Sequence, residues 1–323
     1  MRAAASALAL ALAGCMSFNS IDIPLTPRFS EYTEKTVSGE AADKVAIVDL
    51  RGVLTDDAEE SIFGSKESKI VSFVEQLKIA EKDPAVKAVV IRIDSPGGGV
   101  TTSDILYHEL KAFRERKKVP VVAAFMGVAA SGGYYVAAGC DRIVAHPTTV
   151  TGSIGVIALH VSLAGLLEKI GVKVTALKAG DRKDVGSPFR ELGEEDRKIL
   201  QAMIDQAHAR FVGVVFEGRQ GRLSLEQVKT LADGRIYSAS QALDAKLVDR
   251  VGYLADAVEE ARALAGVKDV RWVMYSRRPQ KVENAYSEIT VQSSLGMSSD
   301  LDRARQLLGF HLCYLWEPYL LGR

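Results

Sequence analysis

The sequence predicts a layered α/β domain, and three observations carry that prediction. Short apolar runs typical of buried strands alternate with longer segments whose apolar residues recur at helical spacing. The 27 glycines and the aromatic fraction of only 7% suit a fold with many tight turns. With 323 residues, 47% of them hydrophobic, the chain is long enough to bury one large core or two moderate ones. Such alternation is typical of a sheet covered by helices.

The predicted elements follow from this pattern in chain order. Strands are expected over residues 45–50, 86–93, 120–126, 143–145, 172–177 and 270–275. Helices are expected over 66–82, from about 101 to 116, and over 134–139, 199–216, 225–232, 240–245 and 254–264. Asp83-Pro84 ends the first helix, and Thr101-Thr102-Ser103 offers N-caps for the second. The longest helix carries a stripe of core residues.

The charge balance argues against nucleic-acid binding, and the hydropathy argues against a membrane-spanning helix after the N-terminus. Lys and Arg number 41, Asp and Glu also number 41, and the formal net charge is zero. This balance argues against a nucleic-acid partner held by phosphate contacts. No stretch after the N-terminus reaches eighteen apolar residues, so no internal membrane-spanning helix is expected.

The N-terminus is typical of an exported, lipid-anchored protein. Met1-Arg2 precedes a mostly apolar run over 3–13, which is too short to span a bilayer but suits a signal peptide. The run ends in Leu12-Ala13-Gly14-Cys15, which resembles the bacterial lipobox, where the cysteine is lipidated. The alternative is a generic secretory signal in which Cys15 is incidental. Residues 1–15 are therefore expected to be a lipoprotein-type signal peptide, and 16–42 a tether from a membrane of the cell envelope.

The other two cysteines carry no predicted chemistry. Cys140 and Cys313 could pair only if the fold brought them together, which the sequence does not show. Their spacing resembles no metal site. Cys140 lies in an apolar run and is expected to be a small buried hydrophobic residue.

A serine between small residues is the most informative motif. Ala129-Ala130-Ser131-Gly132-Gly133 joins a predicted strand to a predicted helix, as a nucleophile at a strand-to-helix turn would. A second turn, Asp94-Ser95-Pro96-Gly97-Gly98-Gly99, follows the strand before it. Either turn alone is ordinary, because proline and glycine favour turns anywhere. Together and in this order, the two could build one acyl-transfer site.

The base for this serine is not evident from the residues alone. None of the five histidines lies in a motif that marks a catalytic imidazole; they are His108, His146, His160, His208 and His311. A lysine can also take a serine proton if burial lowers its pKa. Lys183 stands out in a loop of glycine and charged residues, although such a lysine is more often simply solvated.

Taken together, these motifs resemble the signal peptide peptidase A (protease IV) family of Ser-Lys peptidases. The resemblance covers about residues 45–264. The matching elements are Asp94-Ser95-Pro96-Gly97-Gly98, Ala130-Ser131-Gly132-Gly133-Tyr134-Tyr135, Thr151-Gly152-Ser153-Ile154-Gly155-Val156, Lys183-Asp184, Ser187-Pro188, Ala232-Asp233-Gly234-Arg235-Ile236-Tyr237 and Leu247-Val248-Asp249.

The resemblance implies a fold and a set of roles. It implies a ClpP/crotonase-like spiral of β-β-α units, with one catalytic domain over 43–265 and a C-terminal extension over 266–323. It implies that Ser131 is the nucleophile, Lys183 the general base and Ser153 the residue that orients the lysine. Gly98 and Gly132 match the two oxyanion-hole donors. No cofactor or metal is implied.

The implied activity is cleavage of extended apolar peptides, such as residual signal peptides, at a membrane. The chain has one catalytic region, so it resembles the short form of the family, which assembles into rings and completes each site from a neighbouring subunit. A ClpP-type Ser-His-Asp site is disfavoured because 152–155 contains no histidine. Two functions of a different class stay open at this point, a non-catalytic assembly protein of the same fold and a crotonase-type acyl-CoA enzyme.

The end of the chain has no role that the resemblance assigns. It is rich in apolar and aromatic residues between 307 and 321, and such a tail seldom stays in water. We expect it to pack on the domain, on a neighbouring subunit or at a membrane interface. One hypothesis is that it caps a subunit contact or occupies a neighbour's groove.

Overall fold

The computed structural model describes residues 31–56, 59–61, 64–66, 68–277, 284 and 313–315. The chain divides into two units, Met1–Glu31 and Tyr32–Arg323, and the fold below is that of the second. The predicted signal peptide with Cys15 and most of the predicted tether lie outside the described residues, as does most of the C-terminal extension.

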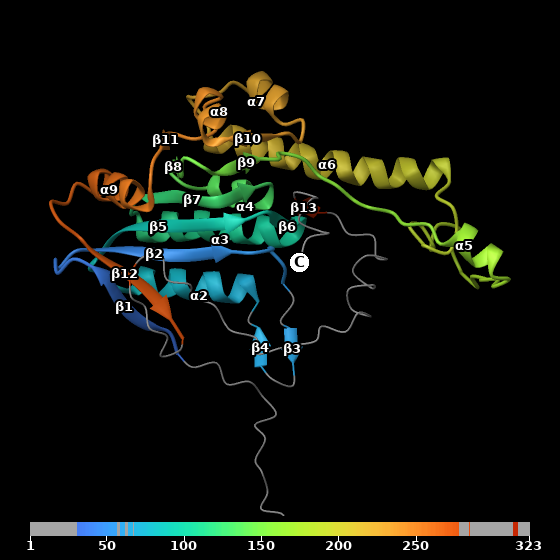
Figure 1. Cartoon of the computed structure of the whole chain (residues 1–323), viewed down its shortest axis with the longest axis horizontal. Helices are drawn as coiled ribbons and strands as arrows, with labels where there is room; N and C mark the ends of the chain where they lie inside the picture. The colour runs from blue at the N-terminus through green and yellow to red at the C-terminus, as the bar shows by residue number, and fades with distance from the viewer. Residues whose placement is uncertain are drawn as a thin grey trace, which may run out of the picture. The chain divides into compact units, whose positions relative to one another are not determined.

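The second unit is built on a largely parallel sheet (Figure 1). Its strand order is β1-β12-β2-β5-β7-β8-β11, and all neighbours pair in parallel except β1 with β12. The bounds are β1 Thr33–Ser38, β2 Lys44–Arg51, β5 Val86–Ser95, β7 Val121–Ala130, β8 Arg142–Ala145, β11 Arg250–Val251 and β12 Arg271–Ser276. The predicted α/β class is confirmed. β1 and β12 precede and follow residues 43–265 in the chain, and together they extend one edge of the sheet.

Besides β5, strand β7 pairs with two different strands along its length. Its first half pairs with β8, whereas Val128–Ala130 pair with β9, Val150–Gly152. Strand β10, Ile236–Ser238, pairs with β9 in antiparallel register. The end of β7, where Ser131 follows, therefore lies beside β9.

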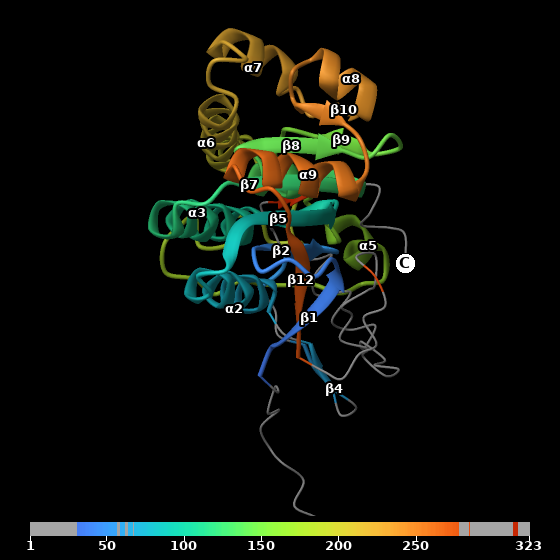
Figure 2. The same cartoon turned by 90° about the vertical axis from the view of Figure 1, so that its left-hand side faces the viewer.

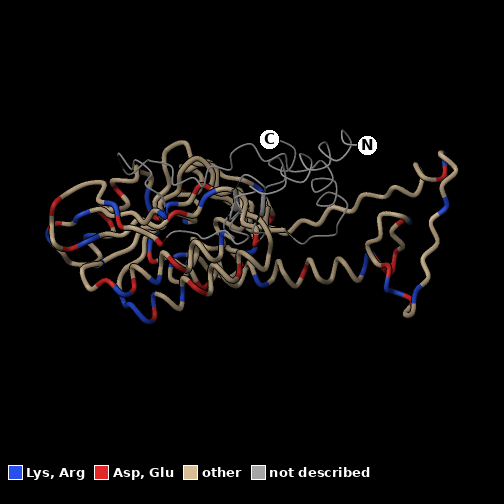
Figure 3. Tube along the Cα trace, turned by 90° about the horizontal axis from the view of Figure 1, so that it is seen from below, with Lys and Arg blue, Asp and Glu red and all other residues tan. Residues whose placement is uncertain are grey.

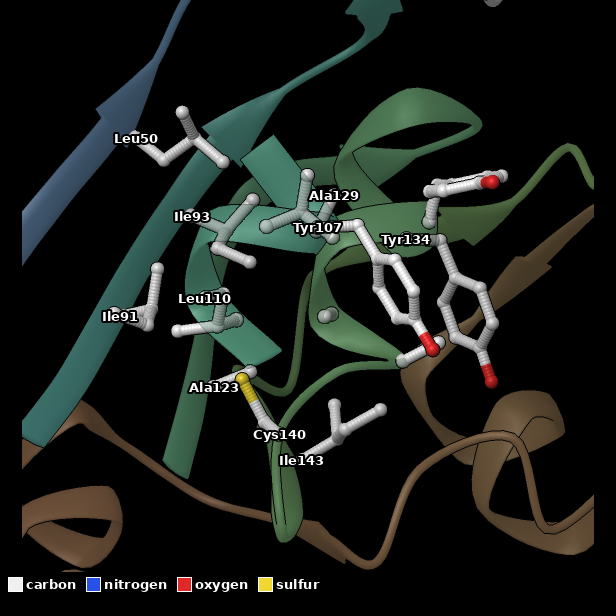
Figure 4. Packing of buried hydrophobic residues seen from close by; sticks show 14 of the residues in the cluster. Leu50, Ile91, Ile93, Tyr107, Leu110, Ala123, Ala129, Tyr134, Cys140 and Ile143 are labelled. Carbon is white, nitrogen blue, oxygen red and sulfur yellow. The ribbon is translucent and has the colours of Figure 1, made fainter. Parts of the chain in front are cut away.

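Helices cover both faces of the sheet and create two cores (Figures 1 and 2). The larger core lies under α2 (Lys69–Lys82), α3 (Val100–Lys117) and α4 (Gly132–Ala137). The smaller core lies under α9 (Leu254–Ala265). Because side chains alternate along a strand, β5 gives Ile91 and Ile93 to the first core and Val90 to the second. Figure 4 shows part of the larger core, where Ile93 and Tyr134 lie among side chains from several elements. Cys140 is buried there, as predicted, and both Cys140 and Cys313 are free thiols.

Helix α6, Glu194–Gly218, reaches well beyond the sheet (Figures 1 and 3). Its C-terminal half packs on the core through Phe211, Val214 and Val215, which are buried. The short α5 (Ala164–Lys169) and the chain over 170–193 lie at its other end. Helices α7 (Leu225–Leu231) and α8 (Ala239–Asp244) follow α6 near the sheet. Among the helices of the described residues, none is both long and apolar enough to cross a bilayer.

The predicted strand over 172–177 is wrong. The structure has no regular secondary structure there, and Val172, Val174 and Leu177 are 45%, 50% and 97% exposed. The segment lies away from the sheet beside α5, so it has no strand edge to pair with in its own described chain. Its apolar residues therefore face solvent. We call residues 159–193 the projecting arm.

A buried ion-pair cluster holds α6 to the sheet and allows a stability prediction. Arg219, only 1% exposed, donates two hydrogen bonds to Asp249, at 2.9 and 3.0 Å. Burial acts to raise the pKa of Asp249, but the hydrogen bond and charge of Arg219, the Ile143 amide and Arg222 outweigh burial and lower that pKa.

We expect Asp249→Asn to lower the free energy of unfolding by about 3–5 kcal/mol at pH 7, because it leaves buried Arg219 without its counter-charge. A carboxyl with a lowered folded-state pKa stabilises fully above its unfolded pKa of about 3.9 and loses this effect as pH falls through the folded-state value. The difference between variant and wild type, measured by urea unfolding, should therefore shrink in acid. Asp233→Asn, which removes an exposed pair with Arg235, is the control and should cost under about 1 kcal/mol. Equal losses in the two variants would contradict the prediction.

Candidate active site

Ser131 lies at a strained turn between β7 and α4. Its φ of 51° and ψ of −116° are unfavourable for a residue with a side chain, and it is the N-cap residue of α4. The Ser131 amide donates to the Gly152 carbonyl at 2.8 Å, which ties the turn to β9. The side chain is 1% exposed, and its Oγ has no hydrogen-bond partner among the described residues. A buried hydroxyl without a partner costs stability, so its retention points to a reaction rather than to packing.

Two glycines, Gly98 and Gly132, lie against each other beside this serine. Strand β6, Gly97–Gly99, runs directly past the start of α4. A methyl group built on Gly132 would lie 3.2 Å from the Gly98 nitrogen, and one on Gly98 would lie 2.1 Å from the Leu54 carbonyl oxygen. A side chain at Gly98 would collide with the Leu54 backbone, and one at Gly132 would require the Ser103 hydroxyl to move. The structure therefore brings together the two glycines that the sequence singled out.

Ser153 lies one residue beyond β9, next to the carbonyl that binds the Ser131 amide. Its φ of 49° is again in the left-handed region, and it is 7% exposed. Its amide donates to the Arg235 carbonyl at 2.8 Å. Two non-glycine residues with left-handed φ thus lie close together at this end of the sheet, which is a concentration of strain typical of functional sites.

A strand from the end of the chain lies in the groove beside these residues. β13, Cys313–Leu315, pairs with β6 in antiparallel register, with Tyr314 opposite Gly98. On its other edge, Cys313 exchanges two backbone hydrogen bonds with Ile157, at 3.0 and 3.1 Å. The segment is therefore held on both edges, as a peptide is held when it adds a strand to a sheet.

The Tyr314 carbonyl points at the glycine pair. A methyl group built on Gly97 would lie 2.0 Å from the Tyr314 carbonyl oxygen and 2.6 Å from the Gly132 nitrogen, so both atoms lie on the same side of Gly97. Since Gly98 is the register partner of Tyr314, this carbonyl lies beside both glycine amides.

The Tyr314 side chain fills a closed aromatic pocket. Its ring is 0% exposed, stacks on Tyr135 at 5.0 Å and contacts Phe211 at 4.7 Å between ring centroids. Its hydroxyl donates to the Ala207 carbonyl at 2.7 Å. Burial and a hydrogen bond to Asp104 raise the pKa of Tyr135. The pocket thus combines two aromatic faces with one hydrogen-bond acceptor at its end.

Lys183 is not brought to Ser131 within one chain. It is exposed and lies in a turn of the projecting arm, next to Arg182, which pairs with Asp196 in the first turn of α6. Of the charged residues described on this turn, Lys178 and Arg190 pair with Asp184, whereas Lys183 forms no ion pair. The burial that a lysine base requires is therefore not provided by the described part of its own chain.

Comparison with known proteins decides the family. The model of peptidase family S49 matches residues 113–268, and that of Clp protease matches 45–150. The chain is 38% identical over 247 residues to "Putative signal peptide peptidase SppA" of Enterococcus faecium, covering 76% of this chain and 71% of that protein. The chain belongs to peptidase family S49.

Other relatives agree with this S49 assignment. The chain is 42% identical to "Putative protease slr0021" of Synechocystis sp., covering 69% of this chain and 75% of that one. It is 31% identical to "Protease 4" of Salmonella typhi, covering 81% of this chain and 41% of that protein. Among solved structures, a mutant of the 1510-N membrane-bound stomatin-specific protease matches with a TM-score of 0.44 at 17% identity, covering 69% of this chain and 86% of that chain. The two family models and the Enterococcus relative confirm the predicted family and ClpP-like fold, and the protein is a serine-type protease.

Three of the four histidines that the structure describes in this S49 peptidase hydrogen-bond to groups other than Ser131. His146 contacts Thr148, His160 contacts the Ser187 carbonyl and His208 contacts the Ala232 carbonyl. A cleft of about 610 Å³ between α3 and α6 contains none of the predicted site residues. The site feature that sequence reasoning missed is β13. Its only signal was the apolar, aromatic composition of the tail, which says nothing of where the tail packs.

Proposed function

We propose that this S49 peptidase is a Ser-Lys endopeptidase that cleaves extended apolar peptides bound as a strand between β6 and Ile157. The observation that supports this most directly is the position of Tyr314. A peptide carbonyl already lies beside the Gly98 and Gly132 amides, while the Ser131 hydroxyl stays unpartnered in the same turn. We take Tyr314 to occupy the position of the residue whose carbonyl is attacked.

The proposed reaction proceeds in two acyl-transfer steps. Neutral Lys183, oriented by Ser153, accepts the Ser131 hydroxyl proton as Oγ bonds to the peptide carbonyl carbon. The Gly98 and Gly132 amides stabilise the negative oxygen that forms. The peptide C–N bond then breaks, and the leaving amine takes the proton from the lysine. Water, deprotonated by the same lysine, cleaves the Ser131 ester and regenerates the serine.

In this proposal Lys183 comes from a neighbouring copy of the chain. The projecting arm exposes apolar side chains that a solitary chain leaves in water, and those most exposed are Leu177 at 97%, Ile170 at 63% and Leu166 at 57%. Exposed apolar groups on one extended segment are typical of a subunit contact. Docking of the arm on a neighbour would bury Lys183 and keep it neutral. Repetition of one such heterologous contact gives a ring if the rotation closes.

The proposed substrates are apolar peptides such as cleaved signal peptides. The aromatic pocket around Tyr314 and the two-sided strand pairing suit an extended chain with a large apolar residue before the cleaved bond. The name of the Enterococcus relative supports this substrate class. We further propose that Cys15 carries a lipid anchor at a membrane of the cell envelope. Mass spectrometry of the mature N-terminus checks this, and an unmodified Cys15 in membrane-extracted protein would contradict it.

The test is cleavage of a fluorogenic peptide with tyrosine before the reporter. We expect turnover by wild type and a loss of about 10⁴-fold or more in kcat for Ser131→Ala, since such sites keep only oxyanion and binding effects without their nucleophile. Ser68→Ala, at the N-cap of α2, removes another buried serine hydroxyl away from the site and should keep full activity. Cleavage by Ser131→Ala at the wild-type rate would refute the mechanism. A wild type inert on many peptides would favour a non-catalytic assembly protein instead.

A further inference from the structure

Strand β6 consists of three consecutive glycines, so its backbone conformation is not restricted by side chains. Glycine loses more backbone freedom on folding than any other residue, and it has no side chain with which to anchor itself. Yet Gly98 must hold its amide in a fixed direction if it is an oxyanion donor. One edge of β6 is fixed by Leu54, whose amide donates to the Gly97 carbonyl at 2.8 Å and whose carbonyl accepts from Gly99 at 2.9 Å. The other edge faces the groove and is paired only while a peptide or β13 is bound there.

A buried serine holds the beginning of β6. Ser95 is 0% exposed, and its Oγ accepts a hydrogen bond from the Gly97 amide at 3.1 Å while donating to the Gly52 carbonyl at 2.7 Å. The backbone of Ser95 also packs against α4, because a methyl group built on Gly133 would lie 3.0 Å from the Ser95 carbonyl oxygen. Ser95 therefore connects the start of β6 to the turn that carries Ser131.

A second buried serine holds the end of β6. Ser103 is also 0% exposed, and its Oγ donates to the Gly99 carbonyl at 2.9 Å. A methyl group built on Gly132 would lie 2.4 Å from this same oxygen, so the hydroxyl lies directly against Gly132. The sequence suggests Ser103 as a helix N-cap, but α3 begins at Val100 and Gly99 is its N-cap residue. The hydroxyl instead lies between the Gly99 carbonyl, which it binds, and Gly132.

From these contacts we infer that Ser95 and Ser103 are positioning residues that hold the Gly98 and Gly132 amides at a fixed separation. Neither serine touches the substrate position. Each fixes one end of the glycine strand and also contacts the first turn of α4, so together they determine the geometry of the oxyanion hole when the groove is empty. This inference rests on the proposed function, because it requires Gly98 and Gly132 to be the oxyanion donors.

The inference predicts a selective loss of transition-state stabilisation. A donor displaced by about 1 Å costs on the order of 100-fold in rate, whereas an extended substrate is still held by strand pairing. In the full-length protein we expect Ser95→Ala and Ser103→Ala each to lower kcat about 10- to 100-fold, with KM within about threefold of wild type. Affinity for a peptide boronic acid, which forms a tetrahedral adduct with a serine, should fall by the same factor. Affinity for the same peptide without the boronate should stay unchanged.

Ser68→Ala is the matched control, because it removes a buried serine hydroxyl of α2 without contact to β6. It should shift Tm by a few degrees, about as much as the test variants do, and leave kcat unchanged. The inference would be overturned if kcat of both test variants lay within twofold of this control. It would also be overturned if the variants bound the peptide boronic acid and the peptide without the boronate equally more weakly. If an alanine variant does not fold, Ser95→Cys or Ser103→Cys is tested in its place, because cysteine nearly keeps the volume of the serine side chain. Ser131→Ala is assayed alongside: if it is active, the proposed function fails, and if only the Ser95 and Ser103 variants behave as wild type, the inference alone fails.

Discussion

Equal parts of the Ser131→Ala and Lys183→Ala variants, unfolded and reassembled together, are expected to recover about a quarter of wild-type activity, although each variant alone is expected to be nearly inactive. The fraction follows from chance, since a site that takes its serine from one copy and its lysine from the next is intact with a probability of about one half times one half. The physical reason is the separation within one chain, where Ser131 follows β7 and Lys183 lies on the projecting arm.

The control for this experiment is the double variant Ser131→Ala, Lys183→Ala mixed with either single variant. A site then lacks the serine or the lysine in every arrangement, so activity should not return. Fluorogenic peptide turnover measures each mixture at one total protein concentration. If the mixed single variants stay inactive while size-exclusion chromatography shows that they have co-assembled, the base acts within one chain and the proposal of a shared site is wrong.

Removal of the C-terminal tail is expected to lower KM for an external peptide about tenfold or more. β13 occupies the same edges of β6 and Ile157 that we assign to the substrate, and tethered segments reach effective concentrations of about a millimolar. An external peptide then binds only the fraction of molecules whose groove is empty, and its apparent affinity falls by that fraction. Deletion of residues 309–323 should remove this competition and leave kcat unchanged.

A free peptide with the sequence of residues 311–317 should inhibit the truncated protein competitively. The same peptide with alanine in place of Tyr314 is the matched control and should bind more weakly, because it cannot fill the pocket of Tyr135 and Phe211. Initial rates across a substrate series separate KM from kcat. Unchanged KM after truncation, together with no inhibition by the free peptide, would show that β13 does not compete with substrate.

The parts of the structure that could be predicted from sequence are those with a local physical cause. The strands from 45–50 to 143–145 are near-continuous apolar runs, which a parallel sheet buries on both faces. The turn at Ser131 was marked by its small neighbours, and a Cβ at Gly132 would collide with the Ser103 hydroxyl. In both cases the required residue types lie next to one another in the chain.

The parts that could not be predicted depend on contacts between distant segments. β13 is three residues long and pairs with a strand more than two hundred residues earlier, so no local pattern specifies its partner. Residues 172–177 alternate as a strand would, but they face solvent and have no edge to join. Ser103 has the sequence signature of a helix cap, and its actual contact with Gly132 depends on the packing of α3 against α4.

The length of α6 has a mechanical consequence for the site. A helix of 25 residues is about 37 Å long, and it is fixed to the core only near its C-terminal end. A tilt of roughly 5° at that end moves the far end by about 3 Å, which is as large as a hydrogen bond is long. Lys183 lies near the end of α6 that is not fixed to the core. The contacts within one chain therefore do not fix the position of its amine. In the shared site that we propose, the angle at which one copy meets the next would set this position, and a small angular error in docking would lower turnover.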